Sequence, residues 1–308
     1  MDLRVAICIV GFRNFEDIHR CLEALGASSY AGFEVAICEN GGDAAFSRLR
    51  DQLGDRLPTG QPVRIVQAHG NPGYAAGINI CMRETDQADA WWVLNPDTVP
   101  DALALDRLVS RLAQGGCDLV ASTVHYANGL VESRGGRWNP WLARAISLDH
   151  GALNGTSAQV GDLERKVNYA SGASMLVGRR FLEGVGPMRE EYFLYAEEVE
   201  WCLRGAARGM KLGIAADARV LHYQGASTGS VTDITKRARM PVYLDERNKM
   251  LLTRDLFAIQ MPIAAAAAFV LLFLRFARRR AWRQLGYGLA GWFAGLRNER
   301  GKPAWVVD

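Results

Sequence analysis

Several features that define common protein classes are missing from this sequence of 308 residues. Its cysteines form no CxxC pair and no spacing typical of a metal site, which argues against a cysteine-bound metal. Several of them lie inside apolar runs, where a cysteine is typical of a small core residue in a reducing compartment. The six cysteines are Cys8, Cys21, Cys38, Cys81, Cys117 and Cys202.

A strong net charge is also absent. The formal net charge is only +3, which argues against a protein that binds nucleic acid over its whole surface. The N-terminal stretch "MDLRVAICIVGF" has no basic region and no long apolar region, so it predicts a first strand instead of a signal peptide. No internal repeat is visible. We therefore expect a cytosolic catalytic part.

The first 125 residues contain two alternating kinds of segment. Short apolar runs rich in β-branched and aromatic residues predict strands that are buried on both faces. These runs are "RVAICIVGF", "FEVAICEN", "VRIVQAH", "WWVLN" and "CDLVAST". Between them lie helical patterns such as "EDIHRCLEAL". The alternation predicts an α/β fold with a mostly parallel sheet flanked by helices, in which ligands bind at the carboxyl ends of the strands.

The remainder of the chain is less regular. We expect hairpins and loops over 124–168, a strand and a short helix over 168–186, a helix over 197–210, and two short strands over 211–225. The run 256–274 is uncharged and barely long enough to cross a bilayer. These patterns predict a catalytic domain over 1–240 and a separate C-terminal helical segment over 241–308.

The stretch "FLYAEEVEW", residues 193–201, places Glu197, Glu198 and Glu200 among aromatic side chains. One interpretation is an exposed helix start, because acidic residues favour the positive end of the helix dipole. The other is a general base in a cleft, where lost solvation raises the pKa of a carboxyl. The stretch alone leaves both interpretations open.

Two polar segments follow predicted strands. Glu39 ends the second run, where a carboxylate can accept a hydrogen bond from a nucleotide base or form part of an ordinary turn. The segment "HGNPGYAAGIN" leads into a helix and contains Asn71, Gly73 and Asn79. Its glycines allow a close approach to phosphate or sugar, although an ordinary strand–helix turn has the same composition.

Asp97 and His222 also follow predicted strands. Asp97 lies just past "WWVLNP", where a carboxylate can hold a divalent cation that binds a diphosphate. It can also cap the next helix, but Asp101 is better placed for that role. His222 ends a later apolar run; a lone histidine is commonly structural, unless it meets Asp97 at the same edge of the sheet.

Eight short motifs occur in an order that resembles the family 2 inverting glycosyltransferases, which have the GT-A fold, and most of all their bacterial rhamnosyltransferase branch. The resemblance covers residues 3–255. The motifs are "AICIVGFRN", "AICENGG", "NPGYAAGIN", "LNPDT", "ASGASMLVGRRF", "FLYAEEVEWCLR", "LHYQGAS" and "RNKMLLTRD".

The resemblance implies a site for a nucleotide-diphosphate sugar across the strand ends. Asp97 would be the main ligand of Mg²⁺ or Mn²⁺, with Asn95 replacing the family's first acid and His222 completing the site. Glu39 stands where the family usually has an aspartate that contacts the base. The implied donor-binding residues are Val10, Phe12, Asn14, Glu39, Asn71, Gly73, Asn79, Asn95 and Asp97.

The resemblance also implies the catalytic residues. Glu197 and Glu198 align with the family's acidic pair, and Glu198 would deprotonate the acceptor hydroxyl in a single displacement that inverts the anomeric carbon. Glu197 would raise the basicity of Glu198 or orient the acceptor. Trp201 would pack beneath the acids on the acceptor side. Glu200 has i,i+4 spacing to Arg204, which indicates a role in helix structure.

The predicted function is the transfer of a sugar to a saccharide or lipid-linked saccharide in the synthesis of cell-surface polysaccharide. The branch favours dTDP-rhamnose as donor, while UDP-sugars stay open. One alternative is a catalytically weak nucleotide-sugar-binding subunit, which the replacements at Glu39, Asn95 and Glu198 favour. A nucleotidyltransferase is disfavoured, because only Arg13 supplies positive charge after the first strand.

The C-terminal segment predicts a peripheral protein at the cytoplasmic face of the inner membrane. Five arginines follow the apolar run closely, and aromatic residues are interleaved with them and with the glycines beyond. Arginines near anionic headgroups and aromatics at the interface are typical of a membrane-surface helix. A buried helix or a homodimer contact is the alternative. Pro262 and the short run make a true span less favourable.

Overall fold

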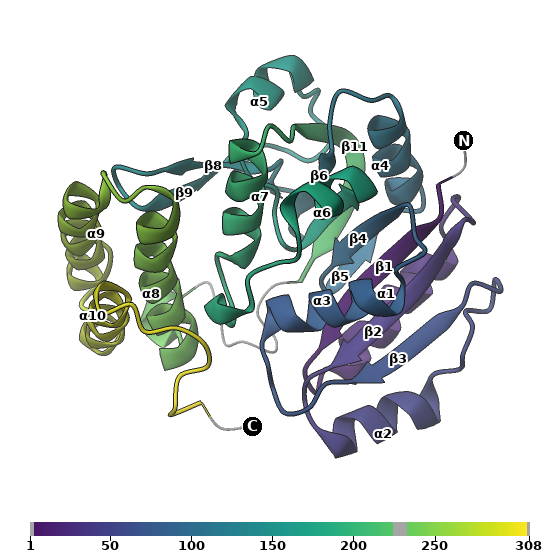
Figure 1. Ribbon diagram of the computed structural model, residues 1–308, viewed down its shortest axis with the longest axis horizontal. Helices are drawn as coiled ribbons and strands as arrows, with labels where there is room; N and C mark the ends of the chain where they lie inside the picture. Colours follow the sequence, from purple (N-terminus) through teal and green to yellow (C-terminus); the bar gives the residue numbers. More distant parts are fainter. Residues whose placement is uncertain (1–2, 224–232, 307–308) are drawn as a thin grey trace.

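A computed structural model describes residues 3–223 and 233–306 as one curled sheet with helices on both faces (Figure 1). Eight strands are hydrogen-bonded in the order β3-β2-β1-β4-β10-β6-β11-β5, and β7 pairs with β6. In chain order the strands are β1 (Val5–Gly11), β2 (Phe33–Glu39), β3 (Val63–Gln67), β4 (Ala90–Leu94), β5 (Thr98–Pro100), β6 (Leu119–His125), β7 (Val131–Ser133), β10 (Ser174–Gly178) and β11 (Leu212–His222).

Helices cover the two faces of this sheet unequally. The helices α1 (Phe15–Gly26), α2 (Asp43–Gln52) and α4 (Ala104–Ala113) pack on one face. The helices α3 (Tyr74–Glu84), α6 (Arg179–Val185), α7 (Glu197–Ala207) and α8 (Arg239–Leu256) pack on the other. A short helix, α5 (Val160–Lys166), and a separate hairpin of β8 (Gly136–Asn139) and β9 (Arg144–Ser147) complete the middle of the chain.

The apolar runs form strands because each supplies side chains to two hydrophobic cores at once. In β1, Ala6, Cys8 and Val10 enter the core beneath α3 and α7. The alternate residues of the same strand enter the core beneath α1 and α4. Trp91 and Trp92 of β4 separate in the same way. Burying a large apolar side chain contributes about 1.5–3 kcal/mol, so continuous apolar runs are what this two-sided burial requires.

Strand pairing divides the sheet into two halves. β3, β2, β1 and β4 are parallel to one another, as the alternation of strands and helices predicts. β10 then lies antiparallel between β4 and β6. Because β10 runs in the opposite direction, its N-terminal end and the loop before it lie beside the carboxyl end of β4. This places a loop distant in sequence at the ligand-binding edge.

One local prediction is wrong, and two helices, α2 and α5, lie where the sequence indicated none. The two short strands expected over 211–225 are the single strand β11, which carries an irregularity between Ala215 and Arg219 in its pairing with β6. The helix α2 has no counterpart in the sequence interpretation. Only Leu49 of α2 is buried, so its hydrophobic period is too weak to indicate a helix. The other strands and helices expected in the first 125 residues are confirmed.

The C-terminal helices form a layer of their own beside α7 (Figure 1), composed of α8, α9 (Met261–Phe276) and α10 (Trp282–Leu296). α8 buries Met250, Leu251 and Leu252 in the core shared with α3 and α7. α10 packs so closely against α8 that a Cβ atom at Gly291 would lie 2.1 Å from the Tyr243 carbonyl oxygen. The predicted domain boundary at 240 falls at the start of α8.

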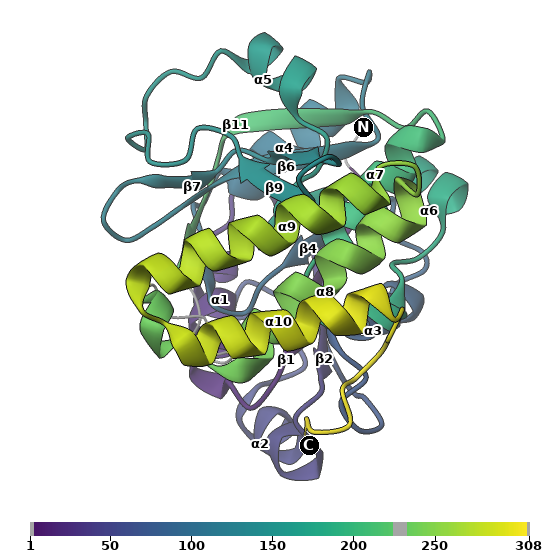
Figure 2. The same cartoon turned by 90° about the vertical axis from the view of Figure 1, so that its left-hand side faces the viewer.

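α9 and α10 form the outer face of this layer, as Figure 2 shows. α9 buries Ala264, Ala268, Leu272 and Phe276, and it exposes large apolar side chains on its opposite side, among them Ile263, Val270, Phe273 and Leu274. Within the described residues one helix, 261–279, is long and apolar enough to cross a membrane by length and composition.

Candidate active site

A cavity of about 580 Å³ lies at the carboxyl ends of β1, β4 and β11. The N-termini of α3 and α7 and the loop 171–173 before β10 form further walls. Helix N-termini present unpaired backbone N–H groups and a positive dipole, which favour anionic ligands. The cavity therefore combines parallel strand ends, where α/β folds bind their ligands, with two helix N-termini, and that of α7 already carries the carboxyl groups of Glu197 and Glu198.

Asp97 and His222 meet in this cavity, as their predicted strand positions suggest. The Nε2 atom of His222 lies 3.3 Å from Oδ1 of Asp97, and its Nδ1 lies 2.8 Å from Oε2 of Glu132 in β7. Burial opposes protonation of the imidazole, but the hydrogen bonds to Asp97 and Glu132 outweigh it and raise the pKa of His222 to about 10. The ring is thus held between two carboxylates.

These side chains fit a divalent cation that is shared with a ligand. Mg²⁺ and related ions are commonly bound by one or two protein groups, with phosphate oxygens and water supplying the rest. Asp97 Oδ1 and His222 Nε2 lie 3.3 Å apart, so a cation that displaced the Nε2 proton would be bound by both. Glu132 fixes the ring from its other nitrogen, as carboxylate partners of metal-binding histidines do. Among the described residues no group of three His, Cys, Asp or Glu side chains forms a complete metal site.

The acidic pair begins α7 and lines the cavity. Glu197 is buried, and its Oε2 has no hydrogen-bond partner among the described residues. Burial and the charge of Glu198 raise the pKa of Glu197 well above its usual range. Burial also raises the pKa of Glu198, against hydrogen bonds from backbone N–H groups at the start of α7. Two carboxyl groups with raised pKa values therefore lie together in the cavity.

Glu200 lies one turn along α7 from Glu197 but does not line the cavity. It is fully buried, accepts hydrogen bonds from Arg204 at 2.8 and 3.1 Å, and forms an ion pair with Arg189 at 3.4 Å. The predicted pairing with Arg204 is confirmed. The helix-start interpretation also describes the position of the acids correctly, since α7 begins at Glu197, but Glu197 and Glu200 are buried instead of exposed.

The loop before α7 has an unusual backbone. Phe193, Tyr195 and Ala196 have φ values of 67°, 74° and 68°, a left-handed conformation that is unfavourable for residues other than glycine. Such strain persists only where the surroundings impose it. The contacts that impose it here come from α8.

Asn248 in α8 holds this loop in place. Its Nδ2 atom lies within hydrogen-bond distance of the carbonyl oxygens of Tyr192 (3.1 Å), Leu194 (2.8 Å) and Tyr195 (2.7 Å). Arg247 donates to the Tyr192 carbonyl as well, at 2.9 Å. Asn248 and Arg247 are almost completely buried. The motif "RNKMLLTRD" thus acts on the acidic pair through the backbone that precedes it.

Contacts across the cavity connect its two sides. The hydroxyl group of Tyr74, at the start of α3, lies 2.9 Å from Asn95 Oδ1 and 3.1 Å from the carbonyl oxygen of Gly172. Gly172 in turn lies against Glu198, where an added Cβ would meet Glu198 Cγ at 3.4 Å. Tyr74 therefore links the Asn95–Asp97 segment to the loop that faces Glu198.

Most of the predicted site residues line the cavity, but three do not. Those that line it are Val10, Phe12, Asn14, Asn71, Gly73, Asn95, Asp97, Glu197, Glu198 and His222. Glu39 lies behind the wall, where it accepts hydrogen bonds from the N–H groups of Arg13 and Gly41 at 3.1 and 2.7 Å. Asn79 is buried and bonds the backbone of Met188 in both directions. Both side chains hold loops that shape the site.

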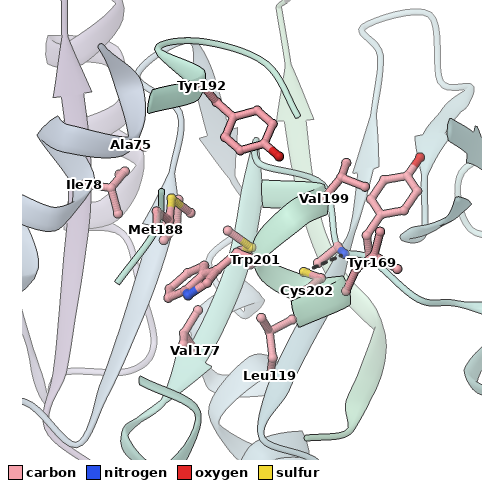
Figure 3. Close-up of a cluster of buried hydrophobic side chains, with 14 of the residues drawn as sticks. Ala75, Ile78, Leu119, Tyr169, Val177, Met188, Tyr192, Val199, Trp201 and Cys202 are labelled. Atoms are coloured by element: carbon pink, nitrogen blue, oxygen red, sulfur yellow. Dashed lines mark hydrogen bonds between the residues drawn. The ribbon is translucent and has the colours of Figure 1, made fainter. Parts of the chain in front are cut away.

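Trp201 is the third residue outside the cavity. It is completely buried, packs edge-to-face on Phe181 at 5.1 Å, and donates from Nε1 to the Gly186 carbonyl at 2.8 Å. Figure 3 shows its ring among Val177, Met188 and Cys202, within the hydrophobic cluster. A fully buried ring has no surface to offer an acceptor, so we assign Trp201 to the packing that supports α7.

Several residues of the cavity were not anticipated from the sequence. They include Tyr74, Glu132, Arg237 and the loop 171–173. Tyr74 lies inside the motif "NPGYAAGIN" and the loop lies inside "ASGASMLVGRRF". The motifs therefore indicated the correct segments but not these residues. Glu132, in the three-residue strand β7, and Arg237 lie outside all of the motifs. In the motif "LHYQGAS", the residues 224–227 lie outside those that the structure describes.

The fold defines a class of protein. The chain superimposes on the mannosyltransferase PcManGT from Pyrobaculum calidifontis, solved with GDP-Man and Mn²⁺, with a TM-score of 0.58 and 16% identity; the match covers 97% of this chain and 88% of that one. At this identity the likeness establishes the fold, which is that of the GT-A glycosyltransferases.

Sequence comparison gives the family. Residues 3–240 match the family described as "Glycosyltransferase like family 2", and the chain belongs to that family. It is 22% identical over 307 residues to the low-salt glycan biosynthesis hexosyltransferase Agl10 of Haloferax volcanii, covering 97% of this chain and 93% of the relative. It is 25% identical over 240 residues to an N-acetylglucosaminyl-diphospho-decaprenol L-rhamnosyltransferase of Mycobacterium tuberculosis, covering 69% of this chain and 73% of the relative.

Proposed function

We propose that this chain is an inverting, metal-dependent glycosyltransferase that moves a sugar from a nucleotide-diphosphate donor to a saccharide or lipid-linked saccharide in surface glycan synthesis. One observation carries the proposal: a single cavity brings Glu198 together with the Asp97–His222 pair. The cavity thus combines a carboxylate that can accept a proton with a place for a cation that binds diphosphate.

Glu198 is the base in this proposal. Its carboxylate takes the proton of the acceptor hydroxyl while the hydroxyl oxygen forms a bond to the anomeric carbon of the donor. The bond between that carbon and the diphosphate oxygen breaks, and the diphosphate leaves with the electron pair. Attack from the face opposite the leaving group inverts the configuration. The raised pKa of Glu198 suits this role, because a stronger base takes a proton more readily.

The other side of the cavity binds the leaving group. Asp97 and His222 would hold Mg²⁺ or Mn²⁺, which would stabilise the negative charge that develops on the diphosphate. The N-terminus of α3 lies on the same side, where its dipole favours an anion. The N–H groups of Gly73 and Tyr74 themselves donate to Asn71 Oδ1 at 3.2 Å and to the Phe193 carbonyl oxygen at 2.7 Å. A Cβ atom at Gly73 would lie 2.3 Å from the Phe193 carbonyl oxygen, so only glycine permits this close approach between the donor loop and the loop before α7.

Rhamnose is the proposed sugar, with dTDP-rhamnose as the donor and UDP-sugars as the alternative. The rhamnosyltransferase of Mycobacterium tuberculosis supports this choice and also supports an acceptor in which a sugar is joined through diphosphate to a lipid. Glu39 does not line the cavity, but one of its carboxylate oxygens, Oε2, has no hydrogen-bond partner among the described residues. A small shift of the loop over it would let that oxygen accept from a base N–H.

We further propose that the protein docks on the cytoplasmic face of a membrane through α9 and α10. The exposed apolar side chains of α9 adjoin those of α10, where Phe269 contacts Trp292 at 5.2 Å. Exposed arginines follow α9 directly, at 278–280, and each can contribute about 1 kcal/mol near an anionic surface. Flotation with anionic liposomes at low salt tests this. If the full-length protein does not float with the liposomes, the exposed face of α9 and α10 serves packing or dimerisation instead.

A catalytically weak nucleotide-sugar-binding subunit is the second candidate. It is favoured by the withdrawal of Glu39 and Asn79 from the cavity, which leaves fewer polar contacts for the nucleotide. Turnover separates the two functions, since a binding subunit would be stabilised by a donor without consuming it.

The test has two stages. Thermal stabilisation by a panel of nucleotide sugars, with Mg²⁺ or Mn²⁺ and with chelator, identifies the donor. Transfer from that donor to N-acetylglucosaminyl diphosphate lipids is then measured, together with the anomeric configuration of the product. Retention of configuration, or stabilisation that ignores the cation, would contradict the mechanism; stabilisation without turnover would favour the binding subunit.

A further inference from the structure

A second concavity lies beside the candidate active site. It is a groove of about 1190 Å³ between the β8–β9 hairpin and α9, with α8 as its floor. We call it the basic groove, after six basic side chains that line it: Arg144, Arg237, Lys249, Arg275, Arg278 and Arg279. Arg237 lines the active-site cavity as well, so the two spaces are neighbours.

The floor of the groove is electrically balanced. Lys249 lies 2.8 Å from Asp245 and 3.0 Å from Glu246, and Arg275 lies 3.2 and 3.3 Å from the same two carboxylates. Two cations and two anions therefore form one network on α8 and α9. This network neutralises Asp245 and Glu246, which would otherwise repel an anionic ligand. The third carboxylate of the groove, Asp233, is exposed and is paired with Lys236 at 3.5 Å.

The rim of the groove carries the excess positive charge. Arg144 on β9 and Arg278 and Arg279 after α9 are exposed. None of the three has an acidic partner within 4 Å among the residues that the structure describes. A guanidinium group binds phosphate through paired N–H donors, so three exposed guanidinium groups around one concavity suit a ligand with two phosphates.

Apolar side chains border the same groove on both sides. On the hairpin side, Trp141, Leu142 and Ile146 are exposed; on the α9 side, Val270 and Leu274 are exposed, and Leu142 and Leu274 also line the groove. Single exposed apolar residues are ordinary, but apolar rims around a charged groove mark a site for an amphiphilic ligand. The same rims are continuous with the exposed face of α9.

We propose that the basic groove binds the diphosphate and the adjoining isoprenoid chain of a lipid-linked acceptor. In this arrangement the arginines of the rim bind the diphosphate, the apolar rims carry the chain toward the membrane, and the sugar reaches past Arg237 to Glu198. This inference rests on the proposed function, which requires an acceptor. The residues of the groove indicate the chemistry of the part of the acceptor that does not react, namely its diphosphate and its isoprenoid chain.

The position of the arginines favours this ligand over a membrane headgroup alone. Arg280 and Arg283 are exposed on the same segment but do not line the groove. Headgroup attraction depends on charge near a surface and would use all of these arginines alike. Binding of a diphosphate inside the groove would depend on Arg278 and Arg279 but not on Arg280 or Arg283, and this difference provides a matched control.

The experiment compares two double variants, Arg278→Gln with Arg279→Gln and Arg280→Gln with Arg283→Gln, each of which removes two charges. Binding of farnesyl diphosphate is measured by calorimetry in the presence of chelator, so that no divalent cation holds the diphosphate in the active-site cavity. Inorganic diphosphate and farnesol are measured in parallel. The melting temperature of each variant checks that it is folded.

We expect the first double variant to weaken binding of farnesyl diphosphate tenfold or more, and the second to change it less than twofold. We also expect inorganic diphosphate and farnesol each to bind more weakly than farnesyl diphosphate. An equal loss in both variants would show a general charge effect and overturn the proposal, as would no loss in either. Because this binding requires no sugar transfer, a failure here and a failure of the proposed function are distinguishable.

Discussion

The active-site cavity and the basic groove lie side by side but are constructed in opposite ways. The cavity is built on strand ends and helix N-termini, and its acidic side chains Asp97 and Glu197 are buried. The groove lies between a hairpin and a C-terminal helix, and its rim consists of exposed arginines and exposed apolar residues. Buried, fixed groups suit a reaction that demands exact geometry, whereas an open charged surface suits recognition of a long, flexible ligand.

This contrast implies different responses to substitution. In the cavity, removal of one group changes the chemistry or the strain of the site, so large effects on turnover are expected. At the groove, exposed side chains contribute little to stability, so effects there should be confined to the acceptor. The following substitutions test the cavity side of the comparison.

Glu198→Gln should produce the largest change. The amide occupies the same space but cannot accept the proton, so turnover should fall roughly 10²–10⁴-fold while donor affinity, measured by titration with the nucleotide sugar, stays nearly constant. Glu183→Gln removes an exposed carboxylate on α6 and is the matched control. Near-normal turnover in Glu198→Gln would move the role of base to Glu197 or remove it.

The pH dependence of turnover in the wild-type enzyme is a second test of the role of Glu198. Since burial raises the pKa of Glu198, the carboxyl stays protonated to a higher pH than an ordinary glutamate, whose pKa is about 4.3. Turnover should therefore rise with pH through a value above that range. An acidic limb at the ordinary value, or the same limb in Glu198→Gln, would argue against Glu198 as the group that titrates.

Asp97→Ala should have the next largest effect, on binding. Loss of the carboxylate removes a ligand of the proposed cation, so the increase in donor affinity that Mn²⁺ or Mg²⁺ produces should shrink roughly 10–100-fold. Calorimetric titration of the donor, with and without cation, measures this. Asp101→Ala, at an exposed neighbouring position, should behave as wild type. If neither chelator nor Asp97→Ala changes activity, the cation site is wrong.

The difference between the two regions also explains what could be predicted from the sequence. The strands that end at the cavity are buried on both faces, so their apolar runs identify them, and the polar residues that follow, such as Asp97 and His222, fall at the predicted edge of the sheet. Motif positions do not reveal side-chain direction, however. Trp201 lies in the most informative motif, yet its ring enters the core.

Elements that depend on long-range contacts escaped prediction. β10 inserts antiparallel between β4 and β6, and no local pattern specifies that order. Glu132 reaches His222 from a three-residue strand, 90 positions earlier in the chain. The basic groove combines a hairpin with a helix more than 120 positions later, so the sequence shows its arginines and apolar residues without showing that they face one another.

Asn248→Ala should act on turnover from outside the cavity. Removing the amide leaves the carbonyl groups of Tyr192, Leu194 and Tyr195 without this donor, and the loop can relax from its left-handed conformation. Because a displacement of about 1 Å can cost roughly 10²-fold in rate, we expect turnover to fall about 10–100-fold with little change in donor affinity.

A packing variant in the same helix separates this positioning role from stability. Leu252→Ala removes a fully buried side chain of α8 that makes no hydrogen bond to the loop. It should lower the free energy of unfolding by about 2–5 kcal/mol but leave the turnover of the folded enzyme nearly unchanged. If Asn248→Ala and Leu252→Ala lowered turnover equally at a temperature where both are folded, Asn248 would have only a structural role.

The smallest expected effect concerns the stability contributed by Glu197. Its folded-state pKa is raised by burial and by the charge of Glu198, so the folded protein holds a proton that the unfolded chain loses above about pH 4.3. The folded state is therefore most favoured at low pH and loses stability as the pH rises toward the raised pKa. Glu197→Gln removes this penalty and should raise the free energy of unfolding at pH 8 by about 0.5–2 kcal/mol, with the gain vanishing below pH 4.

Glu200→Gln should change the free energy of unfolding in the opposite direction, because it leaves Arg204 and Arg189 without their buried carboxylate. Chemical denaturation at pH 4 and pH 8 measures both variants. A stabilising Glu200→Gln or a destabilising Glu197→Gln at pH 8 would contradict the contrast between a carboxyl group at the cavity that is unpaired among the described residues, Glu197, and a paired one in the core, Glu200.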